Sequence, residues 1–467
     1  MDASMTEDPS DGAAAPAWIT AGAQYVAEWI RYQFRASQQP GCSIAITCRG
    51  EPVLDLVLGR ADLARDIALS SEHFYRMASH NKAFTAAGML LLCERGLASL
   101  DDRIDRYIDD LNPQLARATI RQLLSHHAGI KRDGVGYPSL RQPFPDAAGL
   151  RTLLGEEPIE GLGVQGKYSN LGFGVAGLVI EAIVSEPYAA WLQREVIEAA
   201  GLAHTFANAS GVHPDHLAHG HSEAVLLGRR QTWPSDQAIG SLDPAFGLVS
   251  IPADLCRFFT QLDPDEGASF LTRASRLEMA QERWEETKGP EPRSYGLGLT
   301  MGVSAGWRWF GHIGGFVGMM SRTIVVPRED LAISVVSNAQ DGRAATWVDG
   351  ALRILKWFKA DYSPSVHAGD WTGRRWNAWG VLDLVASGDR IVLANPAQSD
   401  PFAFVPCIQI TGPDTGRLEQ CNAFSSCGEP ARLVRGVDGR VAALDLAGDL
   451  WLPEDAYVAE LTEADKA

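Results

Sequence analysis

The sequence of 467 residues predicts an α/β protein with a small all-β domain at its C-terminal end. Two observations lead to this prediction. Alternating strand patterns occur around residues 42–62 and again around 307–338, each beside an amphipathic helix, with a largely helical stretch between them. After Pro364, short alternating runs and turn residues replace the helical periodicity.

The first elements are a helix and a hairpin. Residues 1–16 form an acidic tail that we expect to be disordered. Apolar residues then recur at helical spacing from Val26 to Phe34, and the helix stops at Pro40-Gly41. The alternation over 42–48 and the run EPVLDLVLGRAD, joined by a short turn, predict a β-hairpin.

The middle of the chain, from about 100 to 240, mixes helices with Gly- and Pro-rich loops. Its segment 131–166 is long and irregular, and such loops commonly line a site. Late in this unit WRWFGHIGG, GMMSRTIVV and LAISVVSN predict three strands, and a second amphipathic helix carries Trp347 and Phe358. We therefore expect one α/β domain over 17–362, in which strands from its beginning and its end join in one antiparallel sheet. Residues 366–467 are expected to form a β-rich domain without a long helix.

Composition and charge exclude several kinds of partner. The net charge is −17 and the pI is near 5.1, whereas nucleic acids and anionic membrane surfaces need a basic face. The N-terminus lacks the features of a secretory signal, and the longest apolar run, LGFGVAGLVIEAIV, is too short to span a membrane. Seven scattered cysteines do not resemble a disulfide framework, so we expect a cytoplasmic protein with reduced thiols.

The first chemical signal is the stretch MASHNKAFTA, in which Ser79 stands three residues before Lys82. On a helix these two side chains lie on one face, one turn apart. A serine hydroxyl needs an adjacent base to become a nucleophile, and a lysine whose pKa is lowered by burial can be that base. The alternative interpretation is that Ser79 only caps a helix.

The second signal is KYSNLGFG, the only Tyr-x-Asn in the chain, at the head of an apolar helix. One interpretation is a capping turn with Ser169 or Asn170 as the N-cap and Tyr168 packed beneath it. The other is that the Tyr168 phenol lies close to Lys82 and relays the serine proton, while Asn170 holds Lys82 and a substrate amide.

The third signal is GHIGG, where His312 is followed by Gly314 and Gly315 inside a strand pattern. Glycine weakens a strand unless the backbone must approach something closely, and a bound acyl group is one such partner. A rival His-x-Gly at His127–Gly129 follows the helical run IRQLL and is interpreted as a helix end. The four histidines of HPDHLAHGH lack a helical frame, so we predict no metal site there.

These three signals, in this order, resemble the serine hydrolases related to class C β-lactamases, DD-peptidases, D-aminopeptidases and the esterases of that fold. The resemblance covers roughly residues 25–360. It extends to FYRMASHNKAFTAAGMLLLCERGLASLDDRIDRYI, IRQLLSHHAGI and DPAFGLVSIPADLCRFF. It implies a β-lactamase/transpeptidase-like fold, in which an antiparallel sheet is flanked by helices and joined by a helical subdomain.

The resemblance also implies roles for single residues. Ser79 would attack a carbonyl to form an acyl-enzyme, and Lys82 and Tyr168 would share the general-base work. The backbone N–H groups of Ser79 and Gly315 would form the oxyanion hole. Removing one donor from such a hole typically raises the activation free energy by about 3 kcal/mol. Neither a metal nor an organic cofactor is implied.

The chain departs from the β-lactamase pattern at His312, where carboxylate-binding enzymes usually carry lysine. A histidine near its reference pKa is mostly neutral at pH 7, which weakens the case for β-lactams. His-x-Gly resembles D-aminopeptidases, D-amino-acid amidases and several esterases. We therefore expect hydrolysis of small amides or peptides, including D-aminoacyl amides. The alternatives are a carboxylesterase, a β-lactamase or DD-carboxypeptidase, and a penicillin-binding sensor that does not turn over. The sequence leaves D or L preference and homo-oligomerisation open.

Overall fold

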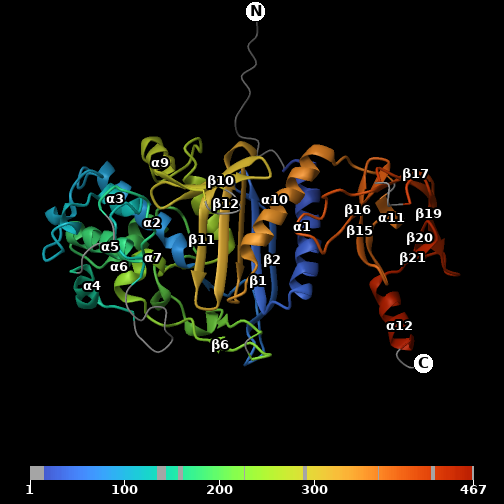
Figure 1. The fold of residues 1–467 in the computed structure, drawn as a ribbon, viewed down its shortest axis with the longest axis horizontal. Helices are drawn as coiled ribbons and strands as arrows, with labels where there is room; N and C mark the ends of the chain where they lie inside the picture. Colours follow the sequence, from blue (N-terminus) through green and yellow to red (C-terminus); the bar gives the residue numbers. More distant parts are fainter. Residues whose placement is uncertain are drawn as a thin grey trace, which may run out of the picture. The chain divides into compact units, whose positions relative to one another are not determined.

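A computed structural model describes residues 15–133, 144–155, 161–225, 227–287, 292–366, 368–421 and 426–464 (Figure 1). Residues 1–14 of the tail predicted to be disordered lie outside these ranges. The chain divides into two compact units, one of residues 27–353 and 396–401 and the other of the remaining segments. The division falls inside the helices α1 (Ala17–Ala36) and α10 (Ala344–Asp361). The domain boundary predicted after residue 362 stays a prediction.

The larger unit is built on a nine-stranded antiparallel sheet. In it β1 pairs with both β2 and β13, so that Ile44 lies opposite Val335, and the predicted joining of the two ends of this unit in one sheet is confirmed. The spatial order of the strands is β3 (Ile67–Ala68), β2 (Glu51–Asp62), β1 (Gly41–Cys48), β13 (Leu331–Ser337), β12 (Met319–Val326), β11 (Trp307–Phe316), β10 (Thr300–Ser304), β9 (Arg293–Tyr295) and β8 (Trp284–Glu286).

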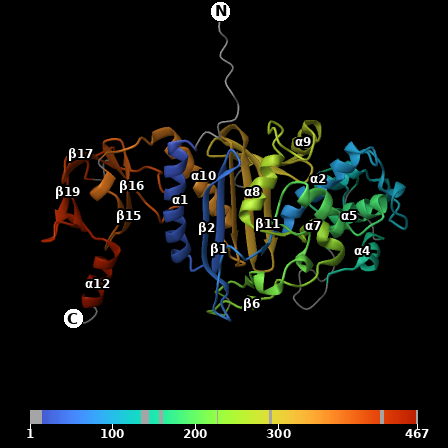
Figure 2. The same cartoon turned by 180° about the vertical axis from the view of Figure 1, so that it is seen from behind.

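Helices cover both faces of this sheet. Helix α8 (Pro252–Gln261) lies across β1, β12 and β13 on one face, as Figure 2 shows. On the other face the first half of α10 contacts β12, where Arg322 Nη1 donates to Asp349 Oδ2 at 2.7 Å. Because both faces are covered, all eight residues of β1 and all seven of β13 are buried, including those that the sequence pattern assigned to an outer face.

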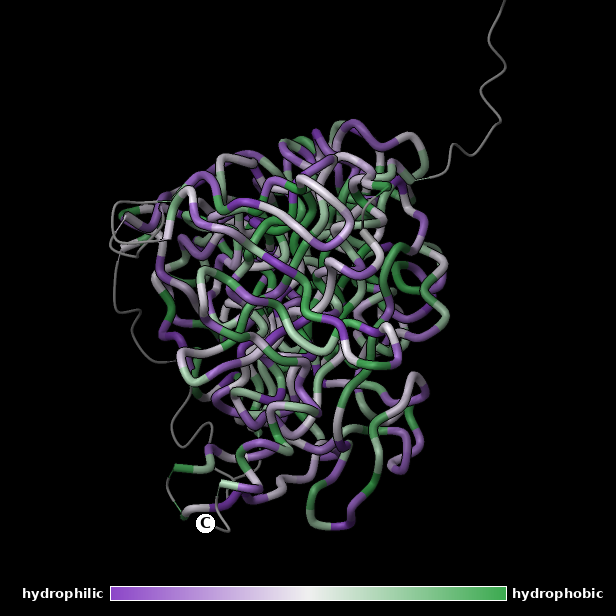
Figure 3. The backbone as a smooth tube through the Cα atoms, turned by 90° about the vertical axis from the view of Figure 1, so that its right-hand side faces the viewer, coloured by the Kyte–Doolittle hydropathy of each residue, from purple (hydrophilic) through white to green (hydrophobic). Residues whose placement is uncertain are grey.

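A helical block completes the larger unit and holds most of its apolar core (Figure 1). Figure 3 shows hydrophobic segments concentrated towards the interior and hydrophilic ones more often at the periphery. The helices of this block are α2 (Asn81–Glu94), α3 (Ile120–Leu124), α4 (Ala147–Leu154), α5 (Asn170–Val184), α6 (Tyr188–Leu192), continued by a π-helical stretch over Gln193–Glu198, α7 (Asp243–Phe246) and α9 (Arg273–Ala280).

Two features of the block bear on the predictions. The segment 131–166, expected to be irregular, contains helix α4, while its residues 134–143 and 156–160 lie outside the described ranges.

In the described part of the chain no single helix is long and apolar enough to cross a membrane. Helix α5 and the helical stretch Tyr188–Glu198, which are bent by 80° relative to each other, meet the requirements together, but only by length and composition.

Two short ribbons lie outside the large sheet, β4 (Tyr75–Arg76) with β7 (Val249–Ser250) and β5 (Gly220–His221) with β6 (Thr232–Trp233). The first ribbon leads directly into a 3₁₀ turn, Ala78–His80, and then into α2. Its pairing with β7 therefore fixes the position from which this turn and α2 start.

The smaller unit contains the predicted β-rich domain, an eight-stranded antiparallel sheet. Its first and last strands are joined by two 2.8 Å backbone hydrogen bonds between Trp376 and Leu452, which close the sheet towards a barrel. The expectation that this region lacks a long helix is wrong, because α12 (Glu454–Ala464) ends it. No residue of α12 is buried, so this helix does not need the continuous apolar face that indicates a helix in a sequence. The strands are β14 (Gly373–Asn377), β15 (Gly380–Ser387), β16 (Arg390–Ala394), β17 (Cys407–Gly412), β18 (Thr415–Glu419), β19 (Pro430–Arg435), β20 (Val441–Leu446) and β21 (Asp449–Trp451), with the short α11 (Ala368–Trp371) before them.

Candidate active site

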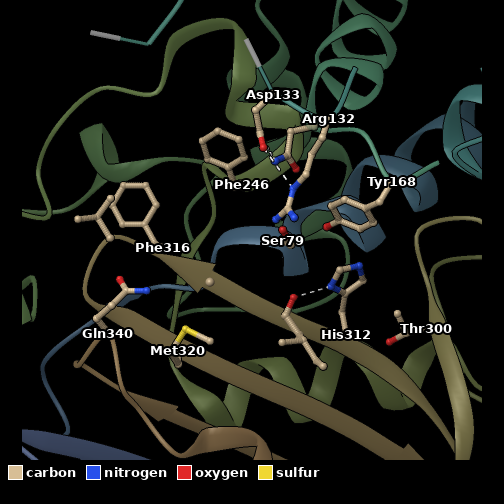
Figure 4. Close-up of a pocket in the computed structure, with 14 residues that line it drawn as sticks. Ser79, Arg132, Asp133, Tyr168, Phe246, Thr300, His312, Phe316, Met320 and Gln340 are labelled. Carbon is tan, nitrogen blue, oxygen red and sulfur yellow. Dashed lines mark hydrogen bonds and ion pairs between the residues drawn. The ribbon is translucent and has the colours of Figure 1, made fainter. Parts of the chain in front are cut away.

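The three sequence signals meet at one pocket of about 680 Å³ in the larger unit (Figure 4). One wall comes from the start of α2 and from the loop before α5, and the other comes from β11. The lining residues are Ser79, Arg132, Asp133, Tyr168, Asn170, Phe246, Thr300, His312, Ile313, Gly315, Phe316, Val317, Met320 and Gln340. Five of the seven predicted site residues line this pocket directly, and Lys82 and Gly314 lie behind its wall.

Ser79 lies in the tight turn that precedes α2. The preceding residue, Ala78, is fully buried and has φ +49°, a left-handed conformation that is strained for a residue with a side chain. Such strain costs of order 1–3 kcal/mol and clusters at functional sites. No side-chain capping bond is formed at the start of this turn or of α2, so the interpretation of Ser79 as a helix cap is wrong.

Lys82 is fully buried one turn after Ser79 and has three oxygen neighbours. Its Nζ lies 3.0 Å from Ser79 Oγ and 2.7 Å from Asn170 Oδ1. The third neighbour is the backbone carbonyl of Ala245 in α7, at 2.9 Å. A protonated lysine donates three hydrogen bonds, so all three neighbours are satisfied when Lys82 carries its charge.

The neutral form of Lys82 has only one arrangement that keeps these contacts. The Asn170 Oδ1 and Ala245 oxygens are carbonyl oxygens that can only accept. The two remaining N–H groups of the amine must therefore point to them. The nitrogen lone pair is then directed at Ser79 Oγ, the only neighbour of the three that has a proton to give.

Electrostatics favour this neutral form. Burial lowers the pKa of Lys82 well below its ordinary range; the Asp133 carboxylate opposes the shift, and the Arg132 guanidinium adds to it. The rings of Tyr168 and Phe173 lie 4.8 and 5.6 Å from Nζ and exclude water from it. Lys82 therefore has the environment of a lysine that acts as a base.

Tyr168 lies beside Lys82 at the edge of the pocket. In Figure 4 its hydroxyl points towards Ser79. Its ring packs on the buried His126, with centroids 4.3 Å apart, and the Arg132 guanidinium lies 5.8 Å from the ring on the pocket side. The predicted capping turn is confirmed, because Ser169 is the N-cap of α5 and its Oγ accepts from the Gly172 N–H at 2.9 Å. Tyr168 beside it also lines the pocket, so it is not only packed beneath this turn.

His312 is buried on β11 and is held in one tautomer. Its Nδ1 lies 2.7 Å from the Ile313 carbonyl, which can only accept, so Nδ1 carries the proton. Nε2 then accepts from the Tyr295 hydroxyl at 3.3 Å. Burial, together with His80 and Lys82, lowers the pKa of His312 well below its ordinary range, so this position carries no fixed positive charge.

The two glycines of the third signal have different surroundings. A Cβ on Gly314 would collide with the Met77 carbonyl and with His80 Nδ1, so only glycine lets β11 approach the turn that carries Ser79. A Cβ on Gly315 would meet nothing closer than Met320 Sδ at 3.7 Å. Gly315 therefore faces the open pocket, which Ser79 also lines.

Several site residues were not expected from the sequence. Arg132 and Asp133 line the pocket from the loop before its undescribed part, and Asp133 Oδ1 accepts from Asn170 Nδ2 at 2.6 Å. His126 stands beside the His127–Gly129 motif that was assigned to a helix end. His127–Gly129 does follow the end of helix α3, as predicted, but the adjacent His126 packs on Tyr168 in the site. Only the repeat of a serine-histidine pair, Ser125-His126 after Ser79-His80, could have drawn attention to it.

The four histidines between 213 and 221 lie in different environments. His221 is buried, and its Nδ1 donates to the Asn338 carbonyl at 2.8 Å, whereas His213 and His216 are exposed on a 3₁₀ turn. Within the described ranges, no three His, Cys, Asp or Glu side chains are arranged to hold a metal ion. All seven cysteines are free thiols.

A comparison with known families matches the model of the Beta-lactamase family to residues 26–354. The chain belongs to the Beta-lactamase family. The membership confirms the family resemblance drawn from the three motifs, and with it the serine-hydrolase class and the β-lactamase/transpeptidase-like fold. The smaller unit lies mostly beyond the matched range.

Individual relatives of this Beta-lactamase family member are distant. Protein flp of Staphylococcus aureus (strain COL) is 26% identical over 181 residues, which are 38% of this chain and 36% of that protein. The chain spans between about a third and a half of the length of the curated relatives that it matches.

Two solved structures show the same fold. The octameric penicillin-binding protein homologue from Pyrococcus abyssi has a TM-score of 0.64 and 19% identity, over 92% of this chain and 99% of that one. The D-amino acid amidase from Ochrobactrum anthropi SV3 has a TM-score of 0.61 and 22% identity, over 74% and 100%. At such identities the likeness concerns the fold alone.

Proposed function

We propose that this protein hydrolyses small amides or peptides, D-aminoacyl amides among them, through an acyl-enzyme on Ser79. The observation that carries the proposal is the contact set of Lys82. This fully buried amine has Ser79 Oγ at 3.0 Å and two oxygens that only accept, so its neutral form is directed at the serine proton. A nucleophile and a desolvated base in one pocket are what acyl transfer requires.

In the first step Ser79 Oγ attacks the substrate carbonyl carbon while its proton passes to Lys82 Nζ. Tyr168, whose hydroxyl points to the same place, shares this proton transfer. The carbonyl oxygen becomes an oxyanion, and the backbone N–H groups of Ser79 and Gly315 are the donors expected to stabilise it. Asn170 keeps the amine in place through its contact of 2.7 Å.

In the second step the tetrahedral intermediate collapses. The C–N bond of an amide, or the C–O bond of an ester, breaks, and the leaving group takes the proton held by Lys82 or Tyr168. A water molecule then attacks the acyl carbon and gives one proton to the same base. The bond between the acyl carbon and Ser79 Oγ breaks, and Ser79 Oγ takes that proton back from the base as the acid product forms. All protons come from the substrate, water and these side chains.

The choice of substrate rests on His312. A neutral, doubly hydrogen-bonded imidazole offers no fixed charge to a substrate carboxylate, which favours amides and esters over β-lactams. The second candidate is a carboxylesterase, since an ester passes through the same intermediate. β-Lactamase or DD-carboxypeptidase activity, and a penicillin-binding sensor that acylates without turnover, are less favoured for the same reason.

A hydrolysis screen tests the proposal. D- and L-aminoacyl p-nitroanilides, short p-nitrophenyl esters and a chromogenic β-lactam are offered to the purified protein. We expect turnover of the anilides, with weaker or absent turnover of the β-lactam. If only the esters are turned over, the carboxylesterase becomes the favoured function in place of the amidase. A single burst of product without turnover would indicate a sensor. Cleavage of none of these, with no burst, would contradict the proposal.

Restoring a cation at position 312 is expected to shift this preference. His312 lines the pocket, so the longer side chain of His312→Lys can extend its amine into the open pocket, where solvent keeps it charged at pH 7. We therefore expect KM for a carboxylate-bearing β-lactam to fall about tenfold, the effect of one added charge contact. The KM for an uncharged ester should stay within a factor of about three. Equal changes for both substrates would mean that the substitution acts through packing.

Other properties stay predictions. The substrate is expected to be a small molecule that needs no cofactor, and neither nucleic acid nor a membrane is expected as a partner. The homologue from Pyrococcus abyssi is described as octameric, which supports a homo-oligomer here. We expect a cytoplasmic location from the seven free thiols.

A further inference from the structure

The side-chain amide of Asn170 lies between two groups of opposite character. On one side its Oδ1 accepts from Lys82 Nζ at 2.7 Å. On the other side its Nδ2 donates to Asp133 Oδ1 at 2.6 Å. The amide therefore forms a bridge from the carboxylate of Asp133, whose side chain is 23% exposed, to an amine that is fully buried.

The orientation of this amide decides the direction of the lysine lone pair. If the amide turned by 180°, its NH₂ group would face Lys82 and its oxygen would face Asp133. Neutral Lys82 would then accept from Asn170, and its lone pair would no longer point at Ser79 Oγ. A carboxylate can only accept, so Asp133 repels the turned amide and stabilises the observed one.

We propose that Asp133 is a positioning residue, which fixes the Asn170 amide and thereby directs the Lys82 lone pair at Ser79. This inference rests on the proposed function, because it concerns the same nucleophile and base. It adds a residue that the sequence signals did not include, and it assigns to an acidic side chain a role in orienting the base.

The backbone around Asp133 keeps the geometry constant. The residues before Asp133 hold the loop that carries Tyr168 and Asn170 through a series of hydrogen bonds. The donor-to-acceptor pairs are Gly163 N to His127 O at 2.9 Å, Lys167 N to His126 O at 2.7 Å, Ser169 N to His126 Nδ1 at 3.1 Å, Ser169 Oγ to Lys131 O at 2.6 Å and Asn170 N to Arg132 O at 2.8 Å. With both backbones fixed, the amide of Asn170 keeps only rotation about its side-chain bonds, and Asp133 restricts that rotation.

Asp133 also influences Lys82 through its charge. The ionisable groups around Lys82 are the Tyr168 phenol, Asp133 and Arg132 from the loop, His126 beside Tyr168, His80 after the nucleophile and His312 on β11. The three histidines are buried with lowered pKa values and stay neutral near pH 7. Asp133 raises the pKa of Lys82 and Arg132 lowers it, so these two charges act in opposite directions.

The test measures the rate at which a fluorophosphonate labels the full-length protein, as a function of pH. Asp133→Ala, and Asp133→Leu as a second variant without an acceptor, should slow labelling about tenfold, the effect of one lost hydrogen bond. Asp133→Asn keeps an acceptor but can also donate to the turned amide, so its labelling rate at high pH should fall between those of the wild type and Asp133→Ala. Asp146→Ala is the matched control, because Asp146 accepts from the Gly149 N–H outside the pocket.

The pH profiles add a readout that loosened packing would not change. Labelling needs neutral Lys82 and therefore rises with pH through the pKa of this lysine. Asp133→Asn removes the charge that raises this pKa, so its profile should move to lower pH. Arg132→Gln removes the charge that lowers it, so its profile should move to higher pH. Shifts in the same direction would contradict the inference.

A double-mutant cycle decides whether Asp133 acts through Asn170. At high pH, where Lys82 is neutral and the charge of Asp133 no longer affects its protonation, the proposed action of Asp133 runs through the Asn170 amide. Under these conditions Asp133→Ala/Asn170→Ala should label no more slowly than Asn170→Ala alone. If the double variant lost labelling rate by the product of the two single losses, the inference would be overturned. Unchanged labelling of Asp133→Ala and Asp133→Leu would overturn it as well. Absence of labelling in the wild type, or its persistence in Ser79→Ala, would instead overturn the proposed function.

Discussion

Ser79→Ala is expected to abolish both turnover and labelling by a fluorophosphonate. The hydroxyl oxygen of Ser79 forms the covalent bond in the proposed reaction, and no other group in the Lys82 contact set can replace it. Removing such a nucleophile typically costs about 10⁴- to 10⁶-fold in rate. Hydrolysis in the screen above and gel detection of the label measure the two effects.

The chain offers a matched serine for this experiment. Ser125 also precedes a histidine, but its Oγ donates to the Arg121 carbonyl at 2.8 Å and has no lysine among its hydrogen-bond partners. Ser125→Ala should therefore keep its labelling. If Ser79→Ala retained a tenth of the wild-type rate, a different nucleophile would have to be sought.

The fold was largely predictable because its sheet is assembled from segments with strong local signals. The β1–β2 hairpin and the three late strands alternate clearly, and both amphipathic helices carry apolar residues at helical spacing. The sequence could not show that β1 is buried on both faces, since this depends on helices far from β1 in the chain, such as α8. Helix α12 was missed for the converse reason, since no residue in it is buried.

The candidate site was predictable where the chemistry needs side chains at fixed spacing. Ser79 and Lys82 are one turn apart, and Asn170 meets them because it starts α5. The Ala245 carbonyl was not predictable, because a backbone acceptor leaves no trace in the sequence. Asp133 stands in an irregular loop, where only the three-dimensional contact with the Asn170 amide reveals its role.

Lys82→Met is expected to slow acylation about 10²- to 10⁴-fold, the usual contribution of a general base. Methionine fills a similar buried volume but has no basic nitrogen that could take the serine proton. Tyr168→Phe provides a comparison, because it removes the second group of the proton relay and leaves Lys82 and its three contacts in place. A Lys82→Met protein that acylates at the wild-type rate would show that another group takes the proton from Ser79.

The same substitution should change how stability depends on pH. Burial lowers the pKa of Lys82 in the folded protein, whereas the unfolded chain has the ordinary value of about 10.4. Between these two values the unfolded state binds the additional proton, so the free energy of unfolding rises with pH. Lys82→Met lacks this group. The wild type should therefore gain stability relative to Lys82→Met by about 1.4 kcal/mol per pH unit across that window. Denaturant unfolding of both proteins from neutral to mildly alkaline pH measures this difference. A difference that stays constant with pH would mean that Lys82 is protonated in the folded state and cannot be the base.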